Sequence, residues 1–325
     1  MNQRAARPQA RPPVLHDGWL RRSSAGHHPR ALEYAVVDVE TTGLDVTAGA
    51  RVCEIAVVRL RGDGTVVEEF ATLVDPRAPV TGREFHGIGD ADVRGAPRPE
   101  DLVGELTRLM SGAVIVGHNL AFEEQFLAAE FVPVGLPPGM PGLCTLRALR
   151  AHLDLPRYSL PRASYALSGR WPSGQHTALG DARATAHLLA ELLYNAPGPL
   201  SYVGALPGRR RSGSDTVGPA AAAGRYKPRL AGVGHGLGQY AGPGTEQSPR
   251  LDLRRWPAWW RPLELAPQDC GGRFGSSERA RALAGAQARS RRHVALTTAV
   301  GWAVGAASIG TLVLGTWTAT RGAGR

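Results

Sequence analysis

The chain has 325 residues, with 38 Lys and Arg against 28 Asp and Glu and a formal net charge of +10. This length allows one or two domains, each large enough to bury its own core. The three cysteines have neither the paired spacing of a disulfide scaffold nor the spacing of a zinc site, which excludes a small disulfide-stapled domain. No apolar stretch follows the N-terminal arginines, so we expect no secretory signal and a cytoplasmic protein.

The charge is distributed unevenly along the chain. Residues 33–194 carry 14 Arg against 21 Asp and Glu, a net charge of −7, whereas residues 1–32 and 195–325 have net charges of +5 and +12. Basic flanks around an acidic unit predict either salt-dependent affinity for nucleic acid or solvated tails without that role. Residues 1–32 are rich in Arg, Pro and His and predict a disordered basic arm.

Apolar runs separated by turns predict a folded unit at residues 33–196. Strands are predicted at residues 34–39, 52–61, 65–74 and 113–116, and helices at residues 99–110, 119–131, 145–153, 160–167 and 181–194. Gly62, Asp63 and Gly64 form a tight turn that joins the second and third strands as a hairpin. A strand meander followed by alternating helices predicts an α/β fold, with a mixed five-stranded sheet and helices on both faces.

Two further segments follow the folded unit. Residues 197–290 contain many Gly, Pro, Ser and Arg residues and predict a linker, with a tryptophan cluster at residues 256–260 that favours a patch docked on the folded unit. Residues 291–325 form an apolar C-terminal segment. Its 24 uncharged residues, 294–317, are long enough to span a bilayer but are mostly Ala, Gly, Thr and Ser. The segment therefore predicts either a membrane anchor or a small-residue helix packed on the folded unit.

Two carboxylates, Asp38 and Glu40, lie at the end of the first strand. Residues at i and i+2 of a strand point to the same face. Two acids on one face of an otherwise apolar strand are costly unless a cation lies between them. Divalent ions held by such acids activate water and neutralise phosphate during phosphodiester hydrolysis. The pair therefore predicts a metal site at the end of this strand.

A histidine and an acid lie at the start of the last helix. Asp181 opens the helix, where the helix dipole favours a negative charge, and His176 lies five residues earlier in a loop that contains Ser and Gly. A loop histidine with a pKa near neutrality is suited to act as a general base. We therefore expect Asp181 and His176 to complete the site of Asp38 and Glu40.

Three motifs, Asp38-x-Glu40, His118-Asn119-x-x-Phe122 and His176-x4-Asp181, resemble those of the DEDDh 3′–5′ exonuclease family. That family includes the proofreading epsilon subunit of bacterial DNA polymerase III. The similarity covers residues 33–194, and Thr177 stands where a tyrosine subclass has its Tyr, which indicates the histidine subclass. The resemblance implies a ribonuclease-H-like fold, two Mg²⁺ or Mn²⁺ ions, and removal of nucleoside monophosphates from single-stranded 3′ ends.

The resemblance also implies roles for individual residues. Asp38, Glu40 and Asp181 would be metal ligands, and His176 would be the base. The remaining implied contacts are to the substrate, and they involve Thr41, Thr42, Gly43, Leu44, Asn119 and Phe122. His86 is a candidate substrate contact, with a structural role in its own loop as the alternative. His118 is expected to hold the junction between a strand and a helix.

Glu123 stands where the second motif of the family usually has Asp. Glutamate is one methylene longer, but Mg²⁺ commonly keeps several waters, so a ligand reached partly through water should tolerate the change. Glu123 is therefore predicted as the fourth metal ligand. Glu124, about 100° further round the helix, is predicted to face solvent. If neither acid binds metal, the activity would be weakened or lost.

These features predict a metal-dependent 3′–5′ exonuclease with a histidine base, acting on nucleic acid with DNA favoured. The alternatives are a weakly active or inactive nucleic-acid-binding module, an RNA exonuclease, and a membrane-anchored protein that carries the nuclease unit as cargo. The sequence shows no polymerase domain and no sliding-clamp peptide, so it does not identify a polymerase partner.

Overall fold

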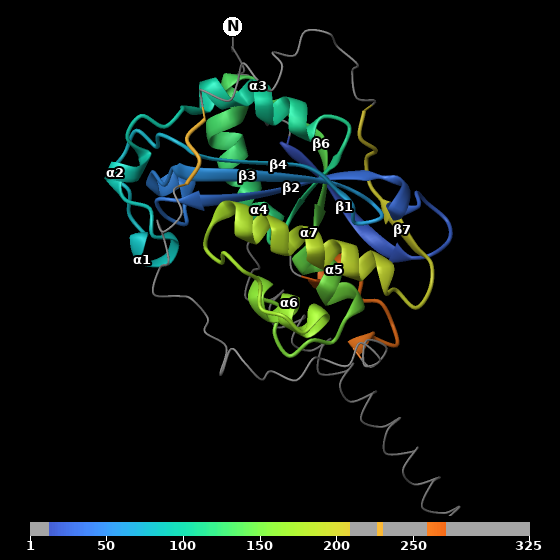
Figure 1. Ribbon diagram of the computed structural model, residues 1–325. Helices are drawn as coiled ribbons and strands as arrows, with labels where there is room; N and C mark the ends of the chain where they lie inside the picture. Colours follow the sequence, from blue (N-terminus) through green and yellow to red (C-terminus); the bar gives the residue numbers. More distant parts are fainter. Residues whose placement is uncertain (1–12, 209–225, 230–258, 271–325) are drawn as a thin grey trace, which may run out of the picture. The chain divides into compact units, whose positions relative to one another are not determined.

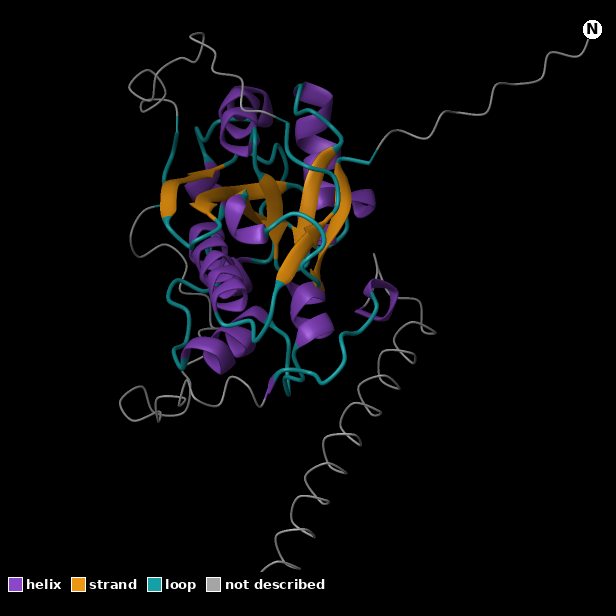
Figure 2. Ribbon diagram, turned by 90° about the vertical axis from the view of Figure 1, so that its right-hand side faces the viewer, coloured by secondary structure: helices purple, strands orange, loops and turns teal. Residues whose placement is uncertain are grey.

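The computed structural model describes residues 13–208, 226–229 and 259–270 (Figures 1 and 2). The chain divides into two compact units, one of residues 1–150 and 155–259 and the other of residues 151–154 and 260–325. In the described ranges no helix has the length and apolar character needed to cross a membrane. The predicted anchor at residues 294–317 lies outside these ranges.

The first unit is built on a mixed sheet with the strand order β4-β3-β2-β5-β6-β1-β7. The strands are β1 Leu15–Arg22, β2 Glu33–Thr41, β3 Val52–Arg61, β4 Val66–Leu73, β5 Val114–Gly117, β6 Met140–Cys144 and β7 Leu200–Val203. Strands β2, β3 and β4 form an antiparallel meander, and β5 pairs in parallel with both β2 and β6. Strand β1 is parallel to β6 and antiparallel to β7. The mixed sheet was predicted, but it has seven strands and not five.

Three of the seven strands had no predicted counterpart: β6, which lies within the predicted folded unit, and β1 and β7, which come from segments that the sequence assigned to the flanks. Strand β1 lies within the predicted disordered arm, and β7 lies within the predicted linker. In β1 only Leu15 and Leu20 are fully buried apolar side chains, and charged residues surround them. This pattern is too sparse to predict a strand. Pairing with β6 and β7 supplies the backbone hydrogen bonds that make one.

Helices cover both faces of the sheet: α3 and α4 pack into one core on one face, and α7, with α6 packed against it, covers the other (Figure 1). The helices are α1 Arg83–His86, α2 Asp90–Val93, α3 Pro99–Met110, α4 Leu120–Phe126, α5 Thr145–His152, α6 Leu160–Ser168 and α7 Ala178–Tyr194. Helix α4 continues into a π-helical turn, Leu127–Phe131. The prediction of a helix over residues 99–110 is confirmed at both ends.

The alternation of β2 and β3 decides which face carries the chemistry. Val37, Val39 and Ile55 point into a core that also contains the leucines of α3. The intervening residues Asp38 and Glu40 point to the other face, which α7 covers. The same alternation that packs the core therefore brings the β2 carboxylates beneath the start of α7.

The second unit is described at residues 151–154 and 260–270. Leu153 and Trp260 form an isolated β-bridge, and the Trp260 ring lies 6.0 Å from the ring of His152. Arg261 is buried and pairs with Asp154 at 3.4 Å. Trp256 of the predicted tryptophan cluster lies outside the described residues, so docking of that cluster on the folded unit stays a prediction.

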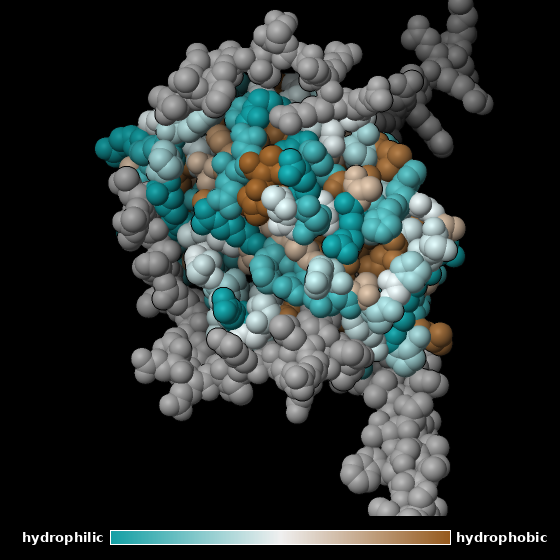
Figure 3. All heavy atoms as spheres, turned by 45° about the vertical axis from the view of Figure 1, so that its right-hand side comes forward, coloured by the Kyte–Doolittle hydropathy of each residue, from teal (hydrophilic) through white to brown (hydrophobic). Residues whose placement is uncertain are grey.

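The surface of the described residues is mostly hydrophilic on the face drawn in Figure 3, with apolar side chains in small separate patches. This mixture is ordinary for a folded domain, because there is too little polar surface to cover one completely. The apolar patches on this face therefore give no reason to place a partner there.

Candidate metal centre

Three of the predicted metal ligands lie together in the structure. Asp38 and Glu40 come from β2, and Asp181 comes from the first turn of α7. One carboxylate oxygen from each lies within 4.8 Å of the others. All three side chains are half-buried, so the cluster keeps access to solvent. Segments that lie more than 140 residues apart in the chain thus form one acidic site.

The start of α7 is fixed by contacts within its own loop. The Thr177 hydroxyl accepts the backbone N–H of Gly180 at 3.0 Å, and Asp181 Oδ2 accepts the N–H of His176 at 3.2 Å. A Cβ at Gly180 would lie 2.0 Å from the carbonyl oxygen of Gly174, so only glycine allows this close approach. The loop therefore holds His176 and Asp181 in a defined relation.

Glu123 lies beside this cluster but outside the 4.8 Å group. It is in the first turn of α4 and is buried, and its charge contributes to the raised pKa of Asp38. Among the residues that the structure describes, its Oε2 atom has no hydrogen-bond partner. A Cβ at Gly117, the last residue of β5, would lie 3.0 Å from that oxygen, so a glycine there makes room for the longer side chain.

The prediction that Glu124 faces solvent is wrong. Glu124 is buried, and its Oε1 accepts the backbone N–H of Leu15 at 3.2 Å. Leu15 belongs to β1, the strand that the sequence did not predict. Glu124 therefore belongs to the packing of β1 against α4, and Glu123 remains the acid of this pair that approaches Asp38.

Burial and mutual repulsion disfavour the charged forms of these carboxylates. Burial raises the pKa of Asp38 well above its ordinary value, and the charges of Asp181 and Glu123 add to the effect. Burial likewise raises the pKa of Glu40 to about 8 and that of Glu123 to about 8. Burial raises the pKa of Asp181 to about 6. Each of these shifts is in the direction that a bound cation would reverse.

A divalent cation fits this set of donors. The ligands are carboxylate oxygens, which suit Mg²⁺ and Mn²⁺ better than the softer metals. Glu123, whose charge acts on Asp38 and whose Oε2 has no partner among the described residues, could supply a further oxygen. A cation would neutralise charges that otherwise repel one another, so the burial of four acids has a simple physical reason.

His176 lies at the edge of the cluster. It has a left-handed backbone conformation, with φ of 60°, which is uncommon for a residue with a side chain. Burial lowers the pKa of its imidazole, which favours the neutral form that can accept a proton. Its carbonyl oxygen accepts a hydrogen bond from Arg229 Nη1 at 3.1 Å.

The loop after β2 contains the predicted nucleotide contacts. Thr41 and Thr42 are buried, and the Thr41 hydroxyl donates to the carbonyl of Gly43 at 2.6 Å. Leu44 is 79% exposed, and its carbonyl accepts the side-chain amide of Gln125 at 3.3 Å. The threonine hydroxyls are thus occupied in shaping the loop, while Leu44 offers an apolar side chain to the surroundings.

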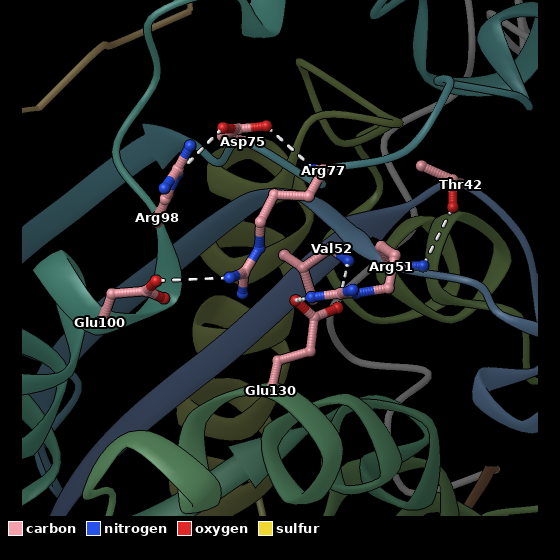
Figure 4. A network of polar contacts seen from close by, with 8 residues as sticks. All are labelled: Thr42, Arg51, Val52, Asp75, Arg77, Arg98, Glu100 and Glu130. Atoms are coloured by element: carbon pink, nitrogen blue, oxygen red, sulfur yellow. Dashed lines mark hydrogen bonds and ion pairs between the residues drawn. The ribbon is translucent and has the colours of Figure 1, made fainter.

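A buried glutamate connects this loop to the start of β3 (Figure 4). Glu130, in the π-helical turn, accepts the N–H of Val52 at 2.7 Å and Nη2 of Arg51 at 3.1 Å. The backbone N–H of Arg51 in turn donates to the Thr42 hydroxyl at 2.9 Å. The loop after β2 is therefore held from below by α4 and its π-helical extension.

The remaining predicted contacts differ in their surroundings. Both ring nitrogens of His86 meet backbone groups of its own segment, Thr81 at 3.0 Å and Ile88 at 3.1 Å, and the ring is buried. These contacts favour the structural alternative for His86. Asn119 is exposed at the start of α4, and Phe122 is half-buried against Phe126, 5.1 Å between ring centres.

His118 holds the junction at the end of β5, as predicted. Its Nδ1 lies 3.0 Å from the Thr145 hydroxyl, and its Nε2 lies 2.7 Å from the carbonyl oxygen of Tyr158. Burial lowers the pKa of His118 to about 4. The ring therefore stays neutral at physiological pH and joins three segments of the chain.

Two residues of the site were missed from the sequence, Glu54 and Arg229. Glu54 lies opposite Glu40 in the β2–β3 register and is buried, and it pairs with Arg229 at 3.0 Å. Its signal was a single acid within the apolar run of β3. Arg229 had no such signal, because it lies in a Gly- and Pro-rich stretch far beyond α7.

Comparison with known proteins gives a consistent result. A family model described as "Exonuclease" matches residues 35–189. DNA polymerase III subunit epsilon of Aquifex aeolicus (strain VF5) is 32% identical over 164 residues, which cover 49% of this chain and 80% of that protein. All four predicted ligands and His176 fall within the residues that the family model matches.

Other relatives are much longer proteins. A DNA polymerase III subunit epsilon-like protein of Rhodobacter capsulatus is 34% identical over 50% of this chain and 24% of its own length. A PolC-type DNA polymerase III of Halalkalibacterium halodurans is 32% identical over 50% of this chain and 12% of its own length. The chain thus spans a quarter or less of these two relatives.

Among solved structures, E. coli exonuclease I in complex with a dA16 oligonucleotide aligns with a TM-score of 0.45 and 18% identity. The alignment covers 51% of this chain and 42% of that one.

Proposed function

Since the chain belongs to the DEDDh exonuclease family, we propose that it is a metal-dependent 3′–5′ exonuclease. It releases nucleoside monophosphates from the 3′ end of single-stranded nucleic acid. The observation that carries the proposal is the meeting of Asp38, Glu40 and Asp181 within 4.8 Å, with buried Glu123 beside them. Carboxylates from three separate segments at one solvent-accessible point suit a hydrolytic metal site better than a structural one.

Asp38, Glu40, Glu123 and Asp181 would hold two Mg²⁺ or Mn²⁺ ions. Such ions, when bound, supply Lewis acidity toward the phosphate and lower the pKa of bound water. The protein contributes a rigid set of oxygen donors, since Asp38 and Glu40 are fixed by the β2 ladder and Asp181 by the contacts at the start of α7. The extra methylene of Glu123 is accommodated at Gly117.

His176 would act as the general base, taking a proton from the attacking water on an imidazole nitrogen. The lowered pKa of its imidazole favours the neutral, proton-accepting form at neutral pH. The half-buried ring lies in a loop whose backbone is bonded to Asp181. The distance between the base, His176, and the metal ligand Asp181 would thereby stay constant during turnover.

The loop after β2 would hold the terminal nucleotide. Backbone groups of residues 41–44 would bind the sugar and phosphate of that nucleotide, and the exposed Leu44 would contact its base or sugar. Backbone contacts and one apolar side chain accept any base, as an exonuclease that works along a strand requires.

We favour DNA over RNA because the relatives are named as subunits or types of DNA polymerase III. The chemistry at the 3′ end is the same for both polymers, so an assay on each is needed. A 5′-labelled single strand of DNA or RNA should be incubated with the full chain and Mg²⁺ or Mn²⁺. Stepwise shortening that chelation stops and Asp38→Ala abolishes is the expected result, with the DNA strand shortened faster.

Two other outcomes would replace the proposal. Strand binding without shortening, in Mg²⁺ and in Mn²⁺, would indicate a nucleic-acid-binding module whose catalytic site has decayed. Shortening of RNA in clear preference to DNA would keep the chemistry and replace the substrate.

A further inference from the structure

The short segment of residues 226–229 returns to the catalytic unit after the chain has left α7. Figure 1 shows it beside the ends of β3 and β4, near α2. The N–H of Leu73 donates to the carbonyl of Lys227 at 2.9 Å, and the N–H of Lys227 donates to the Thr72 hydroxyl at 3.0 Å. The Tyr226 ring meets Phe70 edge-on, 4.9 Å between centres. The segment is thus anchored along the outer edge of β4.

A side-chain contact fastens the segment at a second point. Lys227 Nζ donates to the carbonyl oxygen of Arg94, at the end of α2, at 2.6 Å. Backbone, aromatic and charged contacts all agree on one position for four consecutive residues. These contacts therefore fix the position of Arg229, the last of the four residues.

That place is the loop that carries His176. Arg229 Nη1 donates both to Glu54 Oε2 at 3.0 Å and to the carbonyl oxygen of His176 at 3.1 Å. The Arg229 side chain is 9% exposed and that of Glu54 is 2% exposed. A guanidinium bonded to a buried carboxylate makes strong charge-assisted hydrogen bonds, so this contact is well suited to fix a backbone carbonyl.

Glu54 holds the other side of the same loop. Its Oε2 also accepts the N–H of Ala178, the first residue of α7, at 3.0 Å. The carbonyl of residue 176 and the N–H of residue 178 are therefore both bonded to one ion pair. His176 needs such support, because its left-handed backbone conformation is disfavoured for a residue with a Cβ.

We propose that Arg229 is a positioning residue of the exonuclease site, which together with Glu54 fixes the backbone on both sides of Thr177 and so sets the places of His176 and Asp181. The proposal rests on the proposed function, in which His176 is the base and Asp181 a metal ligand. It extends the catalytic unit beyond the folded region that the family shares, to a segment outside the matched residues 35–189.

The alternative is that Arg229 inhibits the site, because its cationic group lies near the carboxylates. The two roles, positioning and inhibition, predict opposite results. If Arg229 positions the loop, its removal lowers kcat. If the segment covers the site and inhibits it, removal raises kcat or lowers KM. The contacts favour positioning, because the guanidinium bonds the carbonyl behind the His176 imidazole and a glutamate outside the three-acid cluster.

The test uses the full chain as wild type, Arg229→Gln, Arg229→Lys and Arg98→Gln. Arg98 is the matched control, because it also pairs with an acid, Asp75 at 3.3 Å, but at an exposed position. Steady-state kinetics on a 5′-labelled DNA strand with Mn²⁺ give kcat and KM. Hydrogen exchange of the peptide that contains residues 174–180 gives a readout independent of catalysis.

For Arg229→Gln we expect kcat to fall about tenfold with KM changed less than about twofold, since removing a group that orients a catalytic residue typically costs 10–100-fold. Exchange at the Ala178 amide should become faster. Arg229→Lys keeps the charge and one nitrogen that can donate to both Glu54 and the residue 176 carbonyl, as Nη1 does, so it should recover most of both effects. Arg98→Gln should behave as wild type.

Unchanged exchange at Ala178 in Arg229→Gln, or an increase in kcat, would overturn the proposal. If the wild-type chain shows no hydrolysis, the proposed function fails, but the exchange comparison still decides whether Arg229 holds the loop. If Arg229→Gln does not fold, Arg229→Lys carries the test, because a loop that exchanges as in wild type while kcat stays low would also contradict the proposal.

Discussion

Two loops border the carboxylate cluster, and a buried glutamate holds each of them in the same manner. Glu130 supports the loop after β2 by accepting the N–H of Val52 and the guanidinium of Arg51. Glu54 supports the loop before α7 by accepting the guanidinium of Arg229 and a backbone N–H at the helix start. Both glutamate side chains are 2% exposed.

The two supports differ in the origin of the arginine. Arg51 is adjacent to Val52, which is bonded to the same glutamate, and it is 31% exposed. Arg229 is 9% exposed and comes from beyond α7. In the described part of the chain, the contacts that hold the loop after β2 come from within the family-matched residues, whereas the His176 loop is held partly from outside them. The contacts that support the site thus include a residue beyond the predicted domain of residues 33–196.

Buried ion pairs of this kind are expected to add more to geometry than to stability. The desolvation of two charges offsets most of their attraction, while removal of one partner leaves a buried charge uncompensated, at a cost of about 3–5 kcal/mol. Both supports therefore matter through what they orient, and the comparison can be tested by changing one element at a time.

The largest expected effect is at the cluster that both loops serve. Asp181→Asn keeps an oxygen to accept the His176 N–H but removes a charge, and we expect activity to fall by on the order of 10³, the several kcal/mol that a metal site supplies. The midpoint of thermal unfolding in a chelator should not fall, because the change removes charge repulsion. A lower midpoint would show that Asp181 is structural.

The second largest effect is expected at Glu123. Glu123→Gln should lower activity about 100-fold, the upper range for groups that tune a metal site, and should weaken Mn²⁺ binding measured by titration calorimetry. Glu123→Asp, the matched variant, restores the usual family residue and should stay within about tenfold of wild type. Equal Mn²⁺ affinity in Glu123→Gln and wild type would remove Glu123 from the ligand set.

The two supports themselves should separate in the kinetics. Glu130→Gln should loosen the loop after β2, and we expect it to raise KM about tenfold with little change in kcat. Glu54→Gln should lower kcat about tenfold with little change in KM. Steady-state rates over a range of DNA concentrations give both constants. The same change in both variants would mean that the loops do not have separate roles.

The last predicted effect is on stability and not on catalysis, and it concerns a third support that has no ion pair. His118 joins β5 to Thr145 and Tyr158, and burial lowers its pKa to about 4 from an ordinary 6.5. The unfolded chain thus binds a proton below pH 6.5 that the folded protein binds only below about pH 4. Stability that is present above pH 6.5 is therefore lost as the pH falls toward 4, by about 2–3 kcal/mol between pH 7 and 4.5.

Urea denaturation at pH 7 and pH 4.5 checks this prediction, with His118→Gln as the comparison. The wild type should lose more stability between the two values than the variant does. Parallel losses in both proteins would show that other groups cause the acid sensitivity.

The sequence was sufficient to predict those features of the fold and site that depend on a short local pattern. Periodicity gave the bounds of β3 and α3, and the i, i+2 spacing of Asp38 and Glu40 correctly predicted that they share a face. The His176-x4-Asp181 spacing likewise placed both residues at the start of α7. These features depend on neighbours within a few residues, which a sequence displays directly.

Features that depend on distant partners were missed. Strand β1 has too few apolar residues to be predicted. Because β1 was missed, the burial of Glu124 was missed too, since Glu124 contacts Leu15 of that strand. Arg229 meets Glu54 across 175 positions of sequence, and its own surroundings are typical of a linker. In both cases the sequence around the residue did not reveal the distant partner that it contacts.

The central claim is that the carboxylates between these loops cut nucleic acid from the 3′ end, and the polarity of the first cut tests it most directly. One DNA strand should be labelled at its 5′ end in one sample and at its 3′ end in another, and both should be treated with the full chain and Mn²⁺. We predict immediate release of labelled mononucleotide from the 3′-labelled strand and a slowly shortening ladder from the 5′-labelled one. Early release of a mononucleotide from the 5′ label, or internal fragments from both, would contradict the account.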